Sequence, residues 1–377
     1  MSSWSERQRG VRLLLGLSRW LGVSPPGERL AYPHLIWSLL LLGCVWFYTL
    51  NRLITMKFYK QVLTIQKLFY FAEYPANMLL TAIFSLRIYR SARFYIRLWL
   101  QLCRLQALLF ENGRQLCAGL EQQHVLRLLC VIIGFHAVCA VVDSAWLNFD
   151  WRLSLPSNCA HQLPSLMISL SLLQYVLAQR LLCLFYAQLN QRLAQLRQRL
   201  PIGICVLALE SQSLEQLRLA AVALDSVQAE LLARFGFVLL LSFGNSLLSL
   251  SYEVFNVFRL LELAQLGDWV LYCYRSLWLL LHGSRIWFVL RVNERIVEQK
   301  CQLCLLLNQL EASDTRLERS INRFLLQLQT NQAQPPAACG LIDLDTLSLG
   351  GFVNALLVIV IFLIQIDLGN KSLRGFV

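Results

Sequence analysis

The amino-acid sequence predicts an all-α membrane protein with seven transmembrane helices. Of its 377 residues, 57% are hydrophobic and 15% are charged, whereas soluble domains have about 45–50% apolar and about 25% charged residues. The mean hydropathy is +0.53. Seven separate segments are apolar over a length that lets a helix cross a hydrocarbon layer of about 30 Å. Composition and segment length therefore indicate the same fold class.

The seven predicted spans are separated by loops of very different length. We expect the first span to serve also as the insertion signal, because residues 1–20 carry scattered basic residues and no small-residue cleavage site. The second span contains Glu73 and Pro75, and Asp143 lies near the end of the third. The predicted spans are 32–50, 68–89, 125–147, 163–189, 235–258, 269–290 and 352–368.

The distribution of Lys and Arg between the loops predicts the orientation of the chain. If the N-terminus is cytoplasmic, 23 of the 34 basic residues fall on the cytoplasmic side and 8 on the other. Cytoplasmic loops carry an excess of Lys and Arg, so we expect a cytoplasmic N-terminus and an extracellular C-terminus. Arg180, Arg275 and Arg285 fall inside spans. Snorkelling towards the cytoplasmic interface explains Arg180 and Arg285, and Arg275 is expected to pair with Glu73 or Asp143.

The two long cytoplasmic connections have the apolar spacing of helices. Apolar residues recur at steps of three and four, which places them on one face of a helix. We expect these helices to extend from the membrane and to pack together as a cytoplasmic module, and the alternative is that they lie on the lipid surface. The apolar positions are Leu189, Leu193, Leu196 and Leu200; then Leu214, Leu217, Ala221, Leu224 and Leu231; then Leu303, Leu307, Leu310, Leu317, Ile321, Phe324 and Leu328, with Asp314 at one seam position.

These features divide the chain into five parts. Pro335 and Pro336 end the last cytoplasmic helix, and a short irregular segment leads from there into the final span. The five parts are a cytoplasmic segment at 1–31, six transmembrane helices with their long helical cytoplasmic loops at 32–290, a cytoplasmic helix and re-entry segment at 291–349, the seventh transmembrane helix at 350–368, and an extracellular tail at 369–377.

The end of the chain carries a motif, ACGLIDLDTLSLGGFVNALLVIVIFLIQI, at residues 338–366. Gly340 precedes Asp343 and Asp345, and the five hydrophobes 360–364 precede Gln365. This run resembles the C-terminal signature of insect gustatory receptors. In that family a Gly-hydrophobe-Asp segment leads into a last span that ends with Thr-Tyr, five hydrophobes and Gln-Phe. Here Val358 and Ile359 replace the Thr-Tyr pair, and Ile366 replaces the Phe.

The resemblance covers the whole chain in architecture and implies a function. The family consists of ligand-gated, non-selective cation channels that are related to insect olfactory receptors and assemble as tetramers around one central pore. By this resemblance the last span lines the pore. The cytoplasmic ends of spans four to six and the segment before the last span form the anchor between subunits. Each subunit would hold a small-molecule tastant in the outer half of spans two to six.

Gln365 is a polar residue in an otherwise apolar span. A Gln side chain in lipid loses its water without gaining a partner, whereas beside a pore it stays hydrated. Four copies would form a polar ring next to apolar rings from Ile361, Val358 and Ile366, which can close a pore by dewetting. The alternative is a hydrogen bond from Gln365 to a neighbouring helix. Asp367 would attract cations at the outer mouth, or it is an ordinary interfacial charge.

The candidate ligand pocket consists of polar and aromatic residues in the outer halves of the spans. Ionisable residues inside a membrane pair with each other or line cavities, and aromatic residues suit flat or amphipathic organic ligands. We therefore expect a bitter-like tastant. The candidate residues are Glu73, Tyr74, His136, Asp143, Trp146, Ser169, Ser171, Tyr175, Tyr272, Arg275 and Trp278.

Other classes of protein fit the sequence less well. A G-protein-coupled-type receptor would have the opposite orientation, and the chain has neither Asp-Arg-Tyr after span three nor Asn-Pro-x-x-Tyr in span seven. A membrane transporter would show internal repeats. The five His residues are dispersed, and the single Cys-x-x-C at Cys301 and Cys304 has no second pair, so we expect neither an enzyme nor a metal site. No cofactor and no nucleic acid is expected.

The remaining expectations concern the setting of the protein. As a gustatory receptor it would lie in the plasma membrane of sensory neurons, in contact with lipid, permeating cations and related subunits. Asn370, Lys371 and Ser372 form an N-glycosylation sequon close to the membrane.

Overall fold

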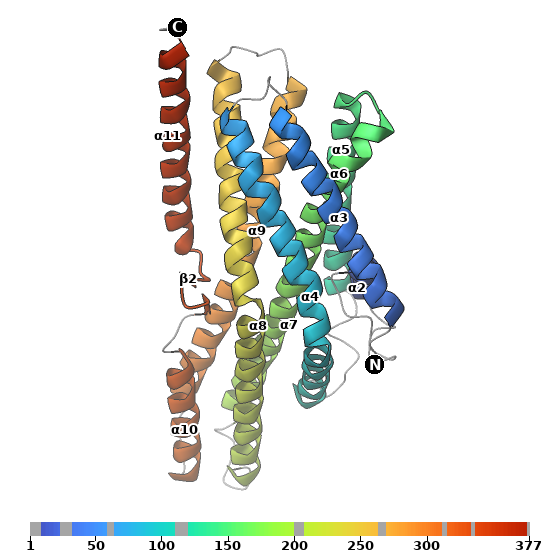
Figure 1. The fold of residues 1–377 in the computed structure, drawn as a ribbon. Helices are drawn as coiled ribbons and strands as arrows, with labels where there is room; N and C mark the ends of the chain where they lie inside the picture. Colours follow the sequence, from blue (N-terminus) through green and yellow to red (C-terminus); the bar gives the residue numbers. More distant parts are fainter. Residues whose placement is uncertain are drawn as a thin grey trace.

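The computed structural model describes residues 9–22, 32–58, 64–109, 120–199, 207–262, 269–310, 315–332 and 336–374. Nearly all of these residues lie in helices that run along one long axis (Figure 1). The helices are α2 (Arg9–Trp20), α3 (Tyr32–Phe58), α4 (Thr64–Leu109), α5 (Leu120–Trp146), α6 (Trp151–Ala160), α7 (Gln162–Arg199), α8 (Leu207–Glu262), α9 (Trp269–Asn308), α10 (Thr315–Gln332) and α11 (Ser348–Arg374). Two short strands, β1 (Ala337–Ala338) and β2 (Ile342–Asp343), form an antiparallel hairpin before α11.

Five stretches of the described residues are helical, long and apolar enough to cross a membrane. They lie in α3, α5, α6 with α7, α8, and α11, and each overlaps one of the predicted spans. The other two predicted spans, 68–89 and 269–290, lie within α4 and α9, which run beside the five (Figure 1). Apolar side chains on the outside of the bundle, such as Leu40, Phe47 and Val131, are exposed. Exposed apolar surface of this kind suits a lipid environment.

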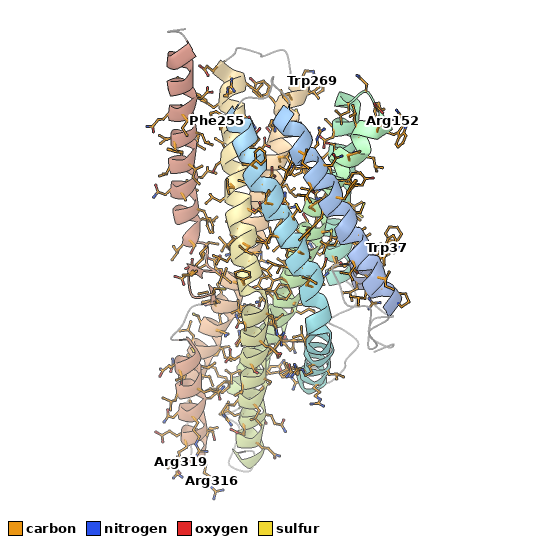
Figure 2. The ribbon with its side chains drawn as sticks, in the orientation of Figure 1. Trp37, Arg152, Phe255, Trp269, Arg316 and Arg319 are labelled. Atoms are coloured by element: carbon orange, nitrogen blue, oxygen red, sulfur yellow. The ribbon has the colours of Figure 1, made fainter. Side chains whose placement is uncertain are left out.

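The end of the bundle opposite the C-terminus is a packed helical module. Every described residue of the predicted apolar stripes in 189–231 and 303–328 is buried, from Leu189 to Leu328, so the predicted packing of these helices is confirmed. The prediction of one seam through 303–328 was wrong in one respect, because the stretch is divided between α9, which ends at Asn308, and α10, which begins at Thr315. Figure 2 shows Arg316 and Arg319 of α10 projecting from this end, whereas Trp269 and Arg152 lie at the other.

Polar contacts tie the helices of this module together. The Tyr186 hydroxyl donates to the Asp225 carboxylate at 2.6 Å, and the Lys300 ammonium lies 2.6 Å from the same oxygen. Asn190 of α7 donates to the backbone and side-chain oxygens of Gln299 in α9 at 2.9 and 3.0 Å. Because α7, α8 and α9 each contribute a partner, these contacts fix the positions of the three helices relative to one another.

The last helix, α11, stands along one side of the bundle beside α8 (Figure 1). Between Ser348 and Gly369, the residues of α11 that are buried within the subunit are Val360 and Asp367. Most of its other apolar side chains are half-buried or exposed, with Val358 60% exposed and Ile361 53% exposed. One face of α11 thus packs on α8, and the rest is open to whatever surrounds the subunit.

The hairpin before α11 is seated on α8 through a close backbone approach at Gly236. A Cβ atom added to Gly236 would lie 3.2 Å from the backbone nitrogen of Cys339, which is tighter than ordinary van der Waals contact. The turn of the hairpin places Cys339 and Gly340 at positive φ, where Gly has no steric penalty. Asp345 then accepts from the Ser348 backbone N–H at 2.9 Å, which satisfies a free donor at the start of α11.

Gly236→Val is expected to destabilise the contact between α8 and the hairpin, because a branched side chain cannot fit against backbone atoms without moving them. We expect a loss of thermal stability of about 1–3 kcal/mol, the usual cost of overpacking, measured as a lower unfolding temperature of the purified protein. Gly244→Val in the same helix is the control, since a Cβ at Gly244 meets no atom within 4 Å. Equal unfolding temperatures for the two variants would show that the contact between Gly236 and the hairpin does not contribute to stability.

Candidate functional site

A cavity of about 260 Å³ lies at the end of the bundle where α6 is placed and α9 begins. Its walls combine charged groups with aromatic rings, and they come from α3, α4, α5, α6, α8 and α9 and from the turn between α6 and α7. The lining residues are Arg52, Glu73, Tyr74, Asp143, Leu147, Ser157, His161, Tyr252, Glu253, Tyr274, Arg275 and Trp278.

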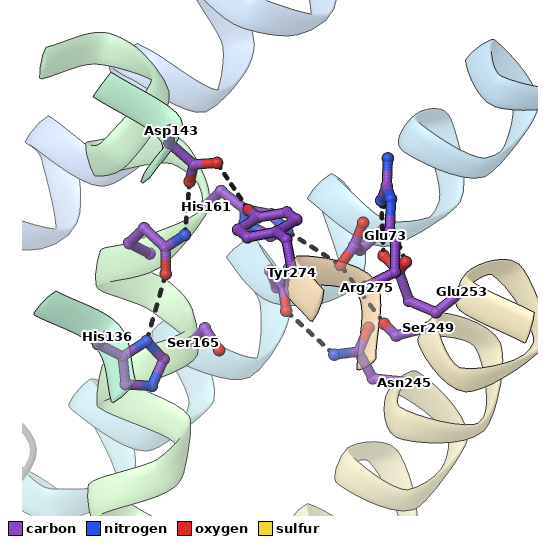
Figure 3. A network of polar contacts seen from close by, with 12 residues as sticks. Glu73, His136, Asp143, His161, Ser165, Asn245, Ser249, Glu253, Tyr274 and Arg275 are labelled. Carbon is purple, nitrogen blue, oxygen red and sulfur yellow. Dashed lines mark hydrogen bonds and ion pairs between the residues drawn. The ribbon is translucent and has the colours of Figure 1, made fainter. Parts of the chain in front are cut away.

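One wall of the cavity is organised by Asp143. Its carboxylate accepts from the Tyr274 hydroxyl at 2.6 Å and from the Gln162 amide at 2.6 Å. The oxygen of Gln162 lies 3.3 Å from Nδ1 of His136, whose Nε2 is 3.5 Å from the Ser169 hydroxyl. Figure 3 shows this chain of contacts running from Asp143 to His136. It connects the cavity on one side with the buried interface between α5 and α7 on the other.

The opposite wall holds two more carboxylates, each with its own partners. Glu73 lies 3.5 Å from Nε2 of His161 and accepts from the Ser249 hydroxyl at 3.4 Å. Arg275 donates through Nη1 to both oxygens of Glu253 at 3.0 and 3.1 Å. The prediction that Arg275 pairs with Glu73 or Asp143 was therefore wrong, because α8 places Glu253 opposite Arg275. Figure 3 shows both pairs close to Tyr274.

Aromatic rings complete the cavity around Trp278. The Trp278 ring is 4.6 Å from His161, 6.3 Å from Tyr274 and 5.6 Å from Phe135, measured between ring centroids. Tyr252 lies in α8, where its ring stacks on Phe69. Aromatic faces next to carboxylates bind the apolar and the cationic parts of small organic molecules.

The chemistry of this cavity is that of a binding site. Concave sites with aromatic walls and a few placed polar groups hold small organic ligands. Among the described residues, no group of three or more His, Cys, Asp or Glu side chains is arranged to hold a metal ion. The carboxylates each have protein partners, so a ligand would have to share or displace these bonds.

The structure brings together five of the predicted pocket residues. Glu73, Tyr74, Asp143, Arg275 and Trp278 all line the cavity.

The other predicted pocket residues lie outside the cavity lining. His136 is joined to it through Gln162, and Ser169 lies one contact further on. Tyr175 is deep in the α7–α8–α9 core, where its hydroxyl donates to Asn293 at 3.0 Å. Tyr272 is half-buried on α9, and the side chain of Trp146 lies outside the described residues.

Sequence reasoning missed several lining residues. Glu253 is a carboxylate within the predicted fifth span, so the rule that singled out Glu73 applies to it equally. His161 sits at the junction of α6 and α7, just before the predicted fourth span, where a loop was expected.

Arg285 was expected to snorkel, but it is 7% exposed and donates to Ser165 and Ser169 of α7.

The predicted pore residues fall on different sides of α11. Val358, Ile361 and Gln365 share the exposed face that points away from α8. Ile366 is half-buried, and Asp367 is buried with its Oδ2 3.7 Å from Nε of Arg259 in α8. The side chain of Asn370 lies outside the described residues, and its backbone belongs to the last turns of α11.

Comparison with known proteins assigns the family. A family model described as 7tm Chemosensory receptor matches residues 11–370. A protein of Drosophila melanogaster named as gustatory receptor 59e is 40% identical over 382 residues, which cover 96% of this chain and 95% of the relative. This chain belongs to the insect chemosensory receptor family, among its gustatory receptors. A second Drosophila melanogaster protein, named as gustatory receptor 59f, is 25% identical over 66% of this chain and 61% of its own length.

Solved structures of an insect olfactory receptor have a similar fold. The insect olfactory receptor OR5 from Machilis hrabei matches with a TM-score of 0.61 at 12% sequence identity, over 96% of this chain and 99% of that one. The same receptor in complex with eugenol matches with a TM-score of 0.57 at the same identity and coverage. The family is one of receptors and not of enzymes, and the match confirms the helical architecture.

Proposed function

We propose that this gustatory receptor is one subunit of a tastant-gated, non-selective cation channel in the plasma membrane of sensory neurons. The tastant binds in the cavity around Trp278, and α11 helices from four subunits surround the pore. The observation that carries the proposal is the exposed face of α11. An apolar helix that packs one face on α8 and presents Gln365 outwards needs a further surface, and a ring of identical helices around water supplies one.

The topology in this proposal has seven crossings, with the N-terminus inside and the C-terminus outside. Figure 1 supports it, because α3 begins on the side of the bundle that faces the packed helical module, whereas α11 runs to the opposite end of the bundle. The projecting Arg316 and Arg319 of α10 then lie in the cytoplasm, as the excess of basic residues on that side requires. The cavity faces the extracellular half of the membrane, where a tastant arrives.

The tastant is proposed to be a small, amphipathic, bitter-like organic molecule. The rings of Tyr74, Tyr252, Tyr274 and Trp278 give the cavity its apolar walls. The eugenol complex of the Machilis hrabei receptor supports a small organic ligand for this fold. The carboxylates favour ligands that donate hydrogen bonds or carry a positive charge.

Helix α9 offers a path from the cavity to the pore helix. Tyr274 and Trp278 near its start line the cavity, and Glu294, further along, accepts from the Thr346 hydroxyl at 2.5 Å, just before α11. This hydrogen bond, together with the Arg291 guanidinium, holds the pKa of Glu294 below its ordinary value. Glu294 is therefore ionised at neutral pH, and a shift of α9 on tastant binding is passed to the start of α11.

Thr346→Val is expected to weaken this link while leaving the cavity intact. The maximal tastant-evoked current per surface receptor should fall about tenfold, because a hydrogen bond to a charged acceptor contributes about 1.5–3 kcal/mol and a tenfold change in opening needs about 1.4 kcal/mol. Thr330→Val in α10 is the matched control, since its hydroxyl donates to the Leu326 carbonyl of its own helix and, among the described residues, to no other element. Wild-type currents from Thr346→Val would exclude this path.

The channel function is tested by expressing the receptor in cells that lack chemosensory receptors. A panel of bitter-like tastants is applied under voltage clamp with a non-hydrolysable GDP analogue inside the cell. We expect a cation current that the analogue does not reduce, and a current abolished by the analogue would assign a G-protein-coupled mechanism. Epitope tags on the two termini check the orientation, with the N-terminal tag hidden and the C-terminal tag accessible on intact cells.

A further inference from the structure

A second and larger cavity lies between α5, α7 and α9. It has a volume of about 390 Å³ and is separate from the tastant cavity, with which it shares no lining residue. Its walls are apolar side chains such as Ile132, Leu173 and Leu281, and the polar exceptions are Ser169, Ser284 and Arg285. We call it the Arg285 groove.

The groove opens sideways from the bundle. Val131 and Leu280 on its rim are 67% and 68% exposed. All of its lining residues fall inside the predicted spans 125–147, 163–189 and 269–290, so the groove lies at the depth of the hydrocarbon layer. An occupant would therefore enter from among the lipid chains, and the part of it that lies along the apolar walls must itself be apolar.

Arg285 gives the groove a charged end. The guanidinium is buried, and its Nε and Nη2 donate to neutral acceptors, the Ser165 carbonyl and the hydroxyls of Ser165 and Ser169, at 2.7 to 3.2 Å. In the described part of the chain, no carboxylate lies within ion-pair distance of Arg285 and Nη1 has no acceptor. Arg275 on the same helix, by contrast, has Glu253, and the nearby Glu73 is engaged by His161 and Ser249.

A buried arginine that stays charged and has only neutral partners is unfavourable, and an acidic partner offsets this cost. Guanidinium groups bind carboxylates through paired, charge-assisted hydrogen bonds. We propose that the Arg285 groove binds a single-chain carboxylic acid of the fatty-acid type, with its carboxylate on Nη1 of Arg285 and its chain along the apolar walls. This binding site shares no lining residue with the tastant cavity.

The depth of Arg285 favours a free acid over a phospholipid. Arg285 is five residues from the inner end of the predicted span 269–290, which is about 8 Å at 1.5 Å per residue. A phospholipid would have to draw its bulky headgroup that far into the hydrocarbon layer, whereas a fatty acid brings only a carboxylate. The Ser169 hydroxyl that bonds Arg285 also lies 3.5 Å from His136, so the occupied groove is connected to the Asp143 wall of the tastant cavity.

The test uses the full-length receptor purified into nanodiscs of zwitterionic lipid and a photo-crosslinking fatty acid with a diazirine in its chain. We expect ultraviolet labelling to map by mass spectrometry to peptides of α5, α7 and α9 that line the groove. The methyl ester of the same probe should label wild-type protein at least about tenfold less, since the ester cannot form the charge-assisted hydrogen bond to Arg285. This comparison needs no variant. Equal labelling by acid and ester would overturn the pairing with Arg285.

Variants and competitors complete the test. Arg285→Met should lose labelling by the acid probe, whereas Arg180→Met, an arginine of α7 outside the groove lining, should retain it. If Arg285→Met does not fold, Val176→Phe, which fills the groove and keeps the arginine, should lose labelling instead. Unlabelled fatty acid should displace the probe. Displacement by phosphatidic acid but not by free fatty acid, or labelling spread evenly over the lipid-facing helices, would overturn the proposal.

Discussion

Arg275→Met is expected to remove a large part of the stability of the receptor. The substitution leaves Glu253, whose side chain is 11% exposed, as a buried carboxylate without the cation that bonds both of its oxygens. Removing one partner of a buried ion pair costs about 3–5 kcal/mol, against a total stability of about 5–15 kcal/mol for a folded domain. We therefore expect a large fall in the unfolding temperature, measured by fluorescence-detected size-exclusion chromatography after heating, and poor delivery to the cell surface.

The double variant Arg275→Met with Glu253→Leu separates charge from packing. Replacing both members of a buried pair by apolar residues of similar size is often neutral or stabilising, so the double variant should regain the wild-type unfolding temperature. It should not regain tastant-evoked current, because both groups line the cavity. Arg152→Met on α6, an exposed arginine at the same end of the bundle, is the control and should change stability by less than about 0.5 kcal/mol. A double variant as unstable as the single one would show that the loss of stability does not come from the unpaired charge of Glu253.

The helices and their buried faces could be predicted from the sequence because the helical spacing of apolar residues repeats within each segment. The stripe from Leu303 to Leu328 is set by the helical period alone, and its residues are buried as expected. The period does not show where one helix ends and the next begins, so the division between Asn308 and Thr315 was missed.

The partners of the charged residues could not be predicted in the same way. Which carboxylate faces Arg275 depends on the relative height and rotation of α8 and α9, and these are set by packing between helices and not by either segment alone. The same holds for Arg285, whose acceptors come from α7. Glu253 itself was recognisable as a carboxylate within a span. It would have been a third possible partner for Arg275, but the sequence alone does not show which of the three carboxylates faces Arg275.

The direction of side chains on α11 corrects the set of candidate gate residues. Successive residues of a helix are turned by about 100°, so Ile366 cannot share a face with Gln365. Val358, Ile361 and Gln365 are spaced three and four residues apart and are all exposed. Asp367 faces α8, where it lies near Arg259. If α11 lines a pore, the gate is therefore formed by Val358 and Ile361 next to the amide of Gln365.

Ile361→Ser is then expected to give a channel that conducts without tastant. A ring of hydroxyls in place of a ring of isoleucine side chains holds water in the narrow part of the pore, and a pore that closes by dewetting no longer closes. The basal cation current per surface receptor should rise at least about tenfold, which corresponds to about 1.4 kcal/mol on the closing equilibrium. Gln365→Leu should act in the opposite direction and reduce tastant-evoked current, because it extends the apolar ring.

Ile366→Ser is the control for this gate, since it makes the same change five residues further along on the half-buried side of the helix. It should leave the basal current at the wild-type level. Both variants are compared at equal surface expression, which removes differences in folding from the currents. If Ile366→Ser leaks and Ile361→Ser does not, α11 presents another face to the conduction path. If neither leaks, the exposed face of α11 is covered by lipid or by a helix of another subunit, and the channel mechanism proposed for this helix fails.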